Sequence, residues 1–461
     1  MKIANKKVSA VRLVQDALDK AHEFSDYNIF TFLNDAAALK KAREIDARIA
    51  RGEKVGRLAG VPYALKDNFL SPEGETTASA LILTGMTSPI TATAVAKLEA
   101  EDAIMIGRTN LDAFAHGSST ENSYFGPTLN SHDRERVAGG SSGGSAVAVA
   151  LDIVEFATGT DTGGSIRQPA SFNGVYGLKP TYGCISRYGV VAMASSTDCI
   201  GFFTKTPDDM NLLMEIASGR DPKDLTTLDN YYNLSTGSAA DVHRIGIIKE
   251  FDNDSVDPEI RGALKKKCEL LKSKGYEIVE LSMPALKYAL AAYYIIVPAE
   301  VASNLSRYDG VRYGFRAENS SDLNKLYANT RDEGFMPENK RRIMIGNFVL
   351  SSGFYDAYFL KAAKVRTLIV EEYKKAFSSC DFLLTPVSPN PAFKLGEKTG
   401  DPVAMYLEDM MSVSLNLAGV PGLAIPAGET AKGLSIGLQI VGPRRSDKSL
   451  IEFAKVLEDE K

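Results

Sequence analysis

Two glycine- and serine-rich runs, each next to apolar residues, constrain this chain more than any other feature. They are AGGSSGGSAVAVA at 138–150 and DTGGSIRQPA at 161–170. Glycine lets the backbone adopt positive φ and come close to a ligand, and the apolar neighbours argue against flexible linkers. A tight strand-to-helix turn accounts for either run alone. Two such turns, presenting Ser141 and Ser165, favour a serine-based acyl-transfer site.

Composition and charge are typical of a soluble globular protein. The 461 residues are 44% hydrophobic and 24% charged, and 53 basic against 58 acidic side chains give a net charge of −5. A protein that grips a nucleic-acid backbone alone normally carries a basic excess, so we expect a partner protein to hold most of any RNA. The four cysteines include no C-x-x-C pair, which fits reduced thiols in the cytoplasm. The longest apolar stretch, 289–299, is too short to cross a bilayer, so no membrane association is predicted.

Alternating strand and helix patterns predict an α/β fold with a large mixed or mostly parallel sheet and helices on both faces. The stretch 284–379 is almost wholly helical, so we interpret it as a helical insertion or cap. No shift in composition divides the chain, and we expect a single domain over residues 1–461. The expected strands are 63–66, 103–106, 153–157, 244–248, 276–281, 382–385 and 434–441, and the expected helices are 11–18, 36–50, 92–98, 258–273, one from near 145 and one from about 447.

A serine nucleophile needs a base, and Lys66 and His116 are the candidates. His116, in FAHGSSTENS, is the best histidine for a Ser-His-Asp triad, whose members can lie far apart in sequence. Lys66 ends the apolar run VPYALK, so it is either a lysine at an exposed strand end or a buried one. Burial lowers the pKa of a lysine and makes the neutral amine common, and beside two serine turns we favour Lys66 as the base. The chain has no H-E-x-x-H, no clustered ligands and no nucleotide P-loop, so no metal site is predicted.

Three segments, in order along the chain, resemble the amidase signature family. They are K-D-N at 66–68, G-G-S-S-G-G-S at 139–145 and D-T-G-G-S-I-R-x-P-A at 161–170, within a core signature of about 60–205. The resemblance implies the amidase signature fold and a Ser–cis-Ser–Lys triad. In that triad Ser165 is the acyl-ester nucleophile, Ser141 bridges at a cis peptide, and Lys66 is the base acting through Ser141.

The same resemblance implies roles for the residues around Ser165. The backbone N–H groups of the turn would form the oxyanion hole, and we interpret Asp161 and Arg167 as an ion pair that supports the loop. The oxyanion residues implied are Thr162, Gly163, Gly164 and Ser165.

Outside the signature, the chain is similar to the branch of that family that provides the A subunit of tRNA-dependent amidotransferases. GSSTENSYFGPTLN, SRYGVVAMASSTD and KRRIMIGNFVLSSGFYDAY carry this resemblance. It implies hydrolysis of glutamine, with the ammonia passed to a B subunit that uses ATP and Mg²⁺ and holds the tRNA, and a small C subunit completing a heterotrimer. No cofactor is expected in this chain. Whether Glu-tRNA(Gln) or Asp-tRNA(Asn) is amidated stays open.

The resemblance also implies groups that hold the free amino acid. Arg342 is the candidate for the α-carboxylate and Asp409 for the ammonium, with Tyr293 beside them. Arg341, its neighbour in the KRR run, is an alternative to Arg342. Two other functions remain as alternatives: a stand-alone amidase of small amides and a non-catalytic scaffold for a partner protein.

Overall fold

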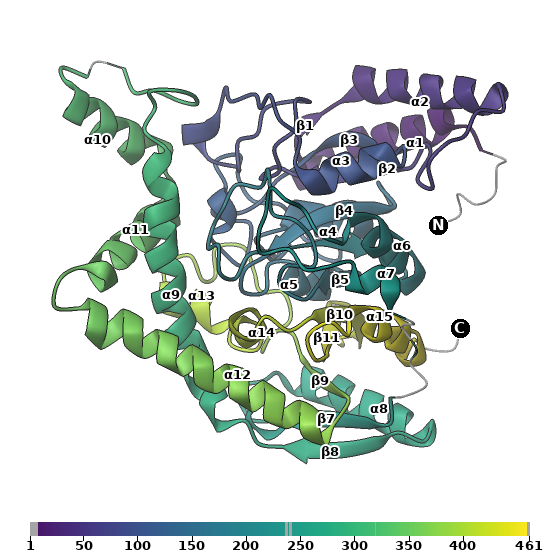
Figure 1. The fold of residues 1–461 in the computed structure, drawn as a ribbon, viewed down its shortest axis with the longest axis vertical. Helices are drawn as coiled ribbons and strands as arrows, with labels where there is room; N and C mark the ends of the chain where they lie inside the picture. The colour runs from purple at the N-terminus through teal and green to yellow at the C-terminus, as the bar shows by residue number, and fades with distance from the viewer. Residues whose placement is uncertain (1–7, 236–237, 239–241, 319, 459–461) are drawn as a thin grey trace.

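The computed structural model describes residues 8–235, 238, 242–318 and 320–458, and in this part of the chain eleven strands form one sheet (Figure 1). The strand order is β1-β3-β2-β4-β6-β5-β10-β11-β9-β7-β8. β2 runs parallel to β3 and β4, β7 runs parallel to β8 and β9, and the other neighbours are antiparallel. The sheet is therefore mixed, and the mostly parallel alternative is wrong.

The strands are β1 Phe30–Leu33, β2 Pro62–Lys66, β3 Ile104–Thr109, β4 Phe156–Asp161, β5 Tyr176–Lys179, β6 Cys199–Thr204, β7 Arg244–Ile248, β8 Glu277–Leu281, β9 Phe382–Pro386, β10 Gly422–Glu429 and β11 Ser435–Val441. The α-helices are α1 Ala10–Glu23, α2 Asp35–Ala50, α3 Thr93–Ala100, α4 Gly143–Ala150, α5 Arg167–Asn173, α6 Pro207–Ala217, α7 Tyr231–Leu234, α8 Pro258–Ser273, α9 Ala289–Asn304, α10 Leu323–Gly334, α11 Pro337–Leu350, α12 Lys361–Ser379, α13 Pro402–Leu407, α14 Val413–Ala418 and α15 Asp447–Ala454.

Helices cover both faces of the sheet, as the sequence pattern predicts. Successive strand residues point to opposite faces, and here they enter two separate hydrophobic clusters. In β2, Tyr63 and Leu65 pack in one cluster and Ala64 in the other, and in β6 Phe202 and Phe203 divide in the same way. The cluster around Ala64 and Phe203 is closed by α1, α2, α4 and α5, while α3, α6, α8 and α9 close the other.

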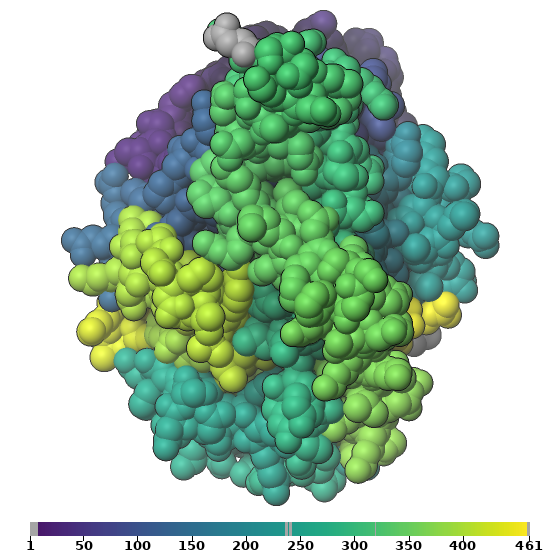
Figure 2. Space-filling model, turned by 90° about the vertical axis from the view of Figure 1, so that its left-hand side faces the viewer, coloured from purple at the N-terminus to yellow at the C-terminus, as the bar shows by residue number. Residues whose placement is uncertain are grey.

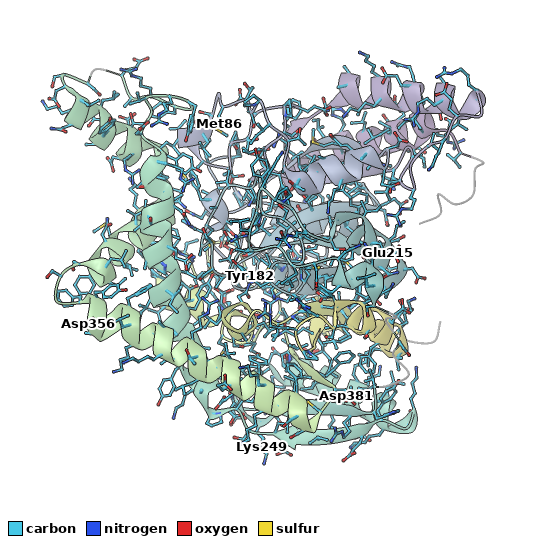
Figure 3. The ribbon with its side chains drawn as sticks, in the orientation of Figure 1. Met86, Tyr182, Glu215, Lys249, Asp356 and Asp381 are labelled. Carbon is cyan, nitrogen blue, oxygen red and sulfur yellow. The ribbon has the colours of Figure 1, made fainter. Side chains whose placement is uncertain are left out.

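The helical stretch 284–379 contains α9, α10, α11 and α12, with a π-helical turn at Tyr355–Leu360 between the last two. In Figure 2, α10, α11 and α12 form a column of green atoms down one face of the molecule. Asp356 lies at the outer edge of this column, away from the sheet (Figure 3). Contacts of α9 with α11, α12 and α14 join the column to the rest of the fold.

One helical run has the length and composition of a membrane span. It covers Pro284–Arg307, which is longer than the apolar stretch that the sequence singles out, and 61% of its most apolar window is buried inside the protein. A buried run of this kind is typical of a core helix. Its residues Tyr293 and Val297 pack in the larger hydrophobic cluster, so we interpret it as part of the core.

Candidate active site

Lys66 is buried at the end of β2, with its amine among hydroxyl groups. Nζ lies 2.9 Å from Ser141 Oγ, 2.7 Å from Ser142 Oγ and 2.8 Å from Thr160 Oγ1. No carboxylate of the described residues hydrogen-bonds to this amine. Hydroxyls both donate and accept, so the site can hold a neutral amine as well as an ammonium.

The environment of Lys66 favours the neutral amine. Burial is the largest influence on its pKa and lowers it from 10.5 to about 7, against the opposing effect of Asp112, Asp161 and Asp198. An amine with a pKa near the working pH is suited to general-base catalysis. The burial of Lys66 is therefore the feature that makes it a candidate base.

Ser141 is held by a turn that requires glycine. The Gly140–Ser141 peptide bond is cis, as the resemblance implies, and Asp112 N–H donates to the Ser141 carbonyl over 3.3 Å. A Cβ at Gly140 would overlap the Asp112 carboxylate, and it would lie 2.6 Å from the backbone nitrogen of Ser119. The close approach of this loop explains the glycine next to Ser141.

The second turn brings Ser165 beside the first, with 8% of Ser165 exposed. The Ser142 N–H donates to the Ser165 carbonyl over 3.2 Å, which ties the two turns together through the main chain. In the described part of the chain, no hydrogen bond joins the hydroxyls of Ser141 and Ser165. The structure thus shows the contact from Lys66 to Ser141, while the step from Ser141 to Ser165 stays a prediction.

The backbone N–H groups of the Ser165 turn differ in availability. The Gly164 N–H donates to Asp161 Oδ1 over 2.9 Å, because the carboxylate folds back across the turn. In this conformation the Gly164 N–H is therefore engaged, and its assignment to the oxyanion hole stays a prediction. The N–H groups of Thr162, Gly163 and Ser165 make no hydrogen bond within the described residues, so these three remain candidates for the oxyanion hole.

Asp161 and Arg167 form the ion pair that the sequence predicts. Arg167 Nε and Nη2 each lie 3.0 Å from an Asp161 oxygen, and both side chains are fully buried. Burial is the largest single influence on the pKa of Asp161 and would raise it, but the charge and hydrogen bonds of Arg167, together with Lys179 and Asn416, lower the pKa to about 2. Arg167 also donates to Gln439 and Asn416 and so joins the turn to β11 and α14.

We expect Arg167→Met to destabilise the protein strongly, because it removes the charge that is paired with the buried Asp161 carboxylate. Breaking one partner of a buried ion pair typically costs about 3–5 kcal/mol of unfolding free energy. Chemical denaturation followed by circular dichroism measures this loss. The control is Arg51→Met, which removes an exposed ion pair with Glu53 and should barely change the transition. Equal transitions for the two variants would contradict the supporting role of Arg167.

The predicted substrate-binding residues lie close to the Ser165 turn. A Cβ at Gly163 would lie 2.5 Å from Tyr293 Oη, so the tyrosine hydroxyl covers that glycine. Asp409 accepts from Ser118 Oγ at 2.8 Å and from Tyr294 Oη at 2.7 Å. Burial raises the pKa of Asp409 to about 7 despite these bonds, so a substrate ammonium would supply the positive charge that this carboxylate lacks.

The two candidate arginines have different environments. Arg342 is 3% exposed, its Nε donates to Glu338 Oε1 over 2.8 Å, and its guanidinium lies 5.3 Å from the ring centre of Tyr294. Arg341 also pairs with Glu338, but 42% of its side chain is exposed. The terminal nitrogens of Arg342 make no hydrogen bond to any described residue. Geometry therefore favours Arg342 over Arg341 as the carboxylate ligand.

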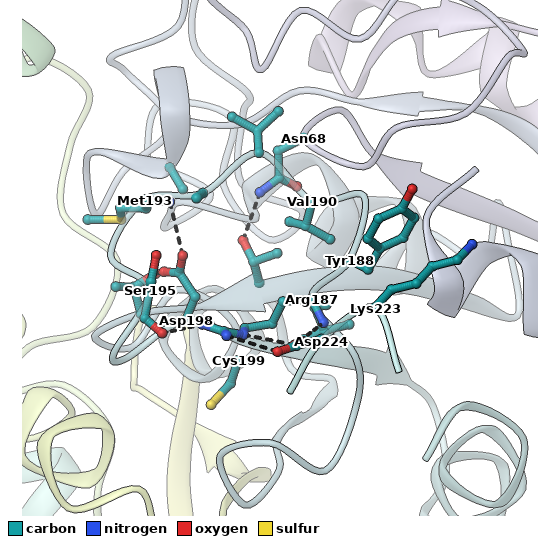
Figure 4. A pocket seen from close by; sticks show the side chains of 16 residues that line it. Asn68, Arg187, Tyr188, Val190, Met193, Ser195, Asp198, Cys199, Lys223 and Asp224 are labelled. Carbon is teal, nitrogen blue, oxygen red and sulfur yellow. Dashed lines mark hydrogen bonds and ion pairs between the residues drawn. The ribbon is translucent and has the colours of Figure 1, made fainter. Parts of the chain in front are cut away.

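Two cavities lie near these groups. One, of about 250 Å³, is lined by Ser118, Arg341, Arg342 and Tyr406 among others. The other, of about 210 Å³, reaches Thr160 beside the Lys66 amine (Figure 4).

Sequence reasoning missed several groups that complete the site. Thr160 and Ser142 share the Lys66 amine with Ser141, and the Ser412 hydroxyl donates to the Gly163 carbonyl. Ser142 lies within the glycine–serine run and could have been considered. Thr160 and Ser412 carry no sequence signal, because their roles depend on how β4 and α14 meet.

The chain is similar to known proteins along nearly its whole length. The model of the family described as Amidase matches residues 12–451. The chain belongs to the amidase family. The A subunit of glutamyl-tRNA(Gln) amidotransferase from Carboxydothermus hydrogenoformans is 48% identical over 461 residues, covering 99% of this chain and 95% of that protein, and the protein of the same name from Persephonella marina is 48% identical over 98% and 94%.

A solved structure extends this similarity to the fold of the amidase family. The crystal structure of the A subunit of glutamyl-tRNA(Gln) amidotransferase from Thermotoga maritima aligns with a TM-score of 0.80 at 38% identity, covering 97% of this chain and 91% of that one. The expected amidase signature fold is confirmed. Among the described residues of this family member, no three His, Cys, Asp or Glu side chains cluster in a way that could hold a metal ion.

Proposed function

We propose that this chain is the glutamine-hydrolysing A subunit of a glutamyl-tRNA(Gln) amidotransferase. The observation that carries the proposal is the buried Lys66 amine in contact with Ser141, in a chain 48% identical to proteins of that name over nearly its whole length. The name of those relatives implies an assembly of several subunits. We expect the heterotrimer with the B and C subunits to act in the cytoplasm, and the B subunit to hold the tRNA and use ATP and Mg²⁺.

In the proposed mechanism, neutral Lys66 accepts a proton from Ser141, which in turn accepts the proton of Ser165. The Ser165 oxygen attacks the side-chain amide carbon of glutamine, and the N–H groups of Thr162, Gly163 and Ser165 stabilise the oxyanion. Ser141 gives a proton to the departing nitrogen, which leaves as ammonia, and takes back the proton held by Lys66, so that the neutral amine is restored. Water then hydrolyses the glutamyl ester and releases glutamate, which restores the free Ser165 hydroxyl.

Glutamine binding in this proposal uses opposite charges at its α-carbon. The terminal nitrogens of Arg342, which make no hydrogen bond to a described residue, suit the carboxylate, and Asp409 suits the ammonium. Tyr293 covers Gly163 at the position where the amide must enter. This arrangement would favour an amino acid amide over an amide without charges.

The decisive experiment is reconstitution of this chain with the B and C subunits. We expect the complex to convert Glu-tRNA(Gln) to Gln-tRNA(Gln) with glutamine and ATP, measured as the amino acid released from the tRNA after deacylation. The chain without partners should prefer glutamine over acetamide and similar simple amides. A complex that leaves Glu-tRNA(Gln) unchanged, together with fast partner-independent turnover of simple amides, would instead establish a stand-alone amidase.

A further inference from the structure

His116 is a buried side chain that the proposed mechanism does not use. It lies in the loop 112–122. The Asp112 N–H of this loop donates to the Ser141 carbonyl, and the Ser118 hydroxyl of the same loop donates to Asp409. Its ring is fully buried and helps to line the cavity that Ser118 and Arg342 also line. Its Nε2 has no hydrogen-bond partner among the described residues. Buried polar atoms without a partner are rare and call for an explanation.

The side chain of Asn339 determines which ring nitrogen of His116 carries the proton. Asn339 Oδ1 accepts from the Met336 N–H over 3.2 Å, and Nδ2 donates to the Ala113 carbonyl over 2.8 Å. These two bonds leave only one orientation for the amide. The second N–H of the same nitrogen faces His116 Nδ1 over 2.6 Å. Nδ1 must therefore accept, and in the neutral ring the proton lies on Nε2.

The charge around His116 keeps the ring neutral. Burial and the nearby Arg342 guanidinium together hold its pKa well below 6.5. Asn339 and Arg342 are three residues apart on α11 and therefore share one side of the helix. His116, bonded to Asn339, and Arg342 both line the same cavity. His116 offers the N–H of Nε2, which has no partner among the described residues. Arg342 offers its terminal nitrogens, which make no hydrogen bond to a described residue.

We propose that the His116 Nε2–H is a second donor to the substrate α-carboxylate beside Arg342, so that His116 selects amides that carry this carboxylate. A carboxylate has about four lone-pair sites and can accept from both groups. Ser118, two residues along the loop, donates to Asp409, which is the proposed ammonium ligand. The loop therefore places the carboxylate and ammonium sites next to each other, as two groups on one α-carbon require. This inference rests on the proposed glutamine hydrolysis.

The test compares two ligands in the full chain assembled with its partner proteins. Glutamine carries the α-carboxylate, whereas 4-aminobutanamide is the same molecule without it. The variants are His116→Met, which fills the space without a donor, and His116→Gln, whose amide can donate. The control is His243→Met, at an exposed histidine just before β7. The readout is kcat/KM, or the inhibition constant where a ligand is not turned over.

We expect His116→Met to raise the KM for glutamine by about 10- to 100-fold, the typical effect of one hydrogen bond to a charged group, with kcat changed by about twofold or less. The constants for 4-aminobutanamide should stay within about twofold of wild type, and His116→Gln should recover part of the loss. Equal losses on both ligands in His116→Met would assign His116 a structural role and overturn the inference. Constants that stay at their wild-type values for both ligands would overturn it as well.

The same data separate this inference from the proposed function. If wild-type protein does not prefer glutamine over 4-aminobutanamide, the proposed glutamine hydrolysis itself fails, and the inference fails with it. If wild type prefers glutamine and His116→Met keeps that preference, only the inference fails.

Nitrogen NMR of the histidine rings, with His116→Met to assign the signal, should show a proton on Nε2 and none on Nδ1. A proton on Nδ1 would contradict the assignment.

Discussion

Lys66→Arg should lower kcat/KM for glutamine almost as much as Lys66→Ala, by about 10²- to 10⁴-fold, the usual contribution of a general base. Arginine stays protonated in proteins, so it can keep a hydrogen bond to Ser141 without accepting its proton. Steady-state ammonia release measures the loss. The matched control is Lys361→Arg, on the exposed side of α12, which should leave the rate unchanged.

The pH profile gives the same prediction a second readout. Because the pKa of Lys66 is lowered to about 7, the neutral amine accumulates as the pH rises through 7. In wild type, kcat/KM should therefore climb across that range and level off above it. Wild-type turnover in Lys66→Arg, or a rate that falls as the pH rises through 7, would contradict the base assignment.

Ser165→Ala should abolish glutamine hydrolysis, with a loss on the order of 10⁶-fold as for the nucleophile of other serine hydrolases. The protein should still fold and bind glutamine, because the alanine removes only one hydroxyl, for which the structure shows no hydrogen bond to a described residue. In the assembled complex, the variant should lose amidation of Glu-tRNA(Gln) with glutamine but keep it when ammonium chloride supplies the ammonia. Ser351→Ala, an exposed serine after α11, is the control.

This experiment also separates an enzyme from a scaffold. A scaffold would keep glutamine-dependent amidation in Ser165→Ala, which would contradict the nucleophile. Loss of amidation with both nitrogen sources would mean that the substitution damages the assembly. The ammonium arm is therefore what makes the result specific to the chemistry of Ser165.

Much of the fold could be predicted where local signals are strong. The helix at 258–273 is correct to the residue, because Asp257 caps it and Pro258 occupies its first position. The expected strand at 153–157 is displaced, since β4 is Phe156–Asp161. The sequence pattern does not predict β1, β5, β6 and β10. Of these, β5 and β6 are buried throughout, and strands buried on both faces lack the alternation that marks a half-exposed strand.

The candidate site shows the same division between local signals and tertiary contacts. The motifs located Lys66 and the two serine turns, because glycine–serine runs of this kind are unusual. The Gly164 N–H donates to the Asp161 carboxylate, which folds back across its own turn. The spacing of residues in the sequence does not predict this hydrogen bond. The role of His116 depends likewise on the amide of Asn339, more than two hundred residues away. Such assignments need the tertiary contacts.

The central claim is that a neutral amine at Lys66 activates Ser165 by way of Ser141. Its most direct test is to quench the complex with acid during glutamine turnover and to map the glutamyl ester by mass spectrometry. We expect the ester on the peptide that contains Ser165, and its disappearance in Ser165→Ala and Lys66→Arg. An ester on any other residue, or one that forms at the wild-type rate in Lys66→Arg, would contradict it.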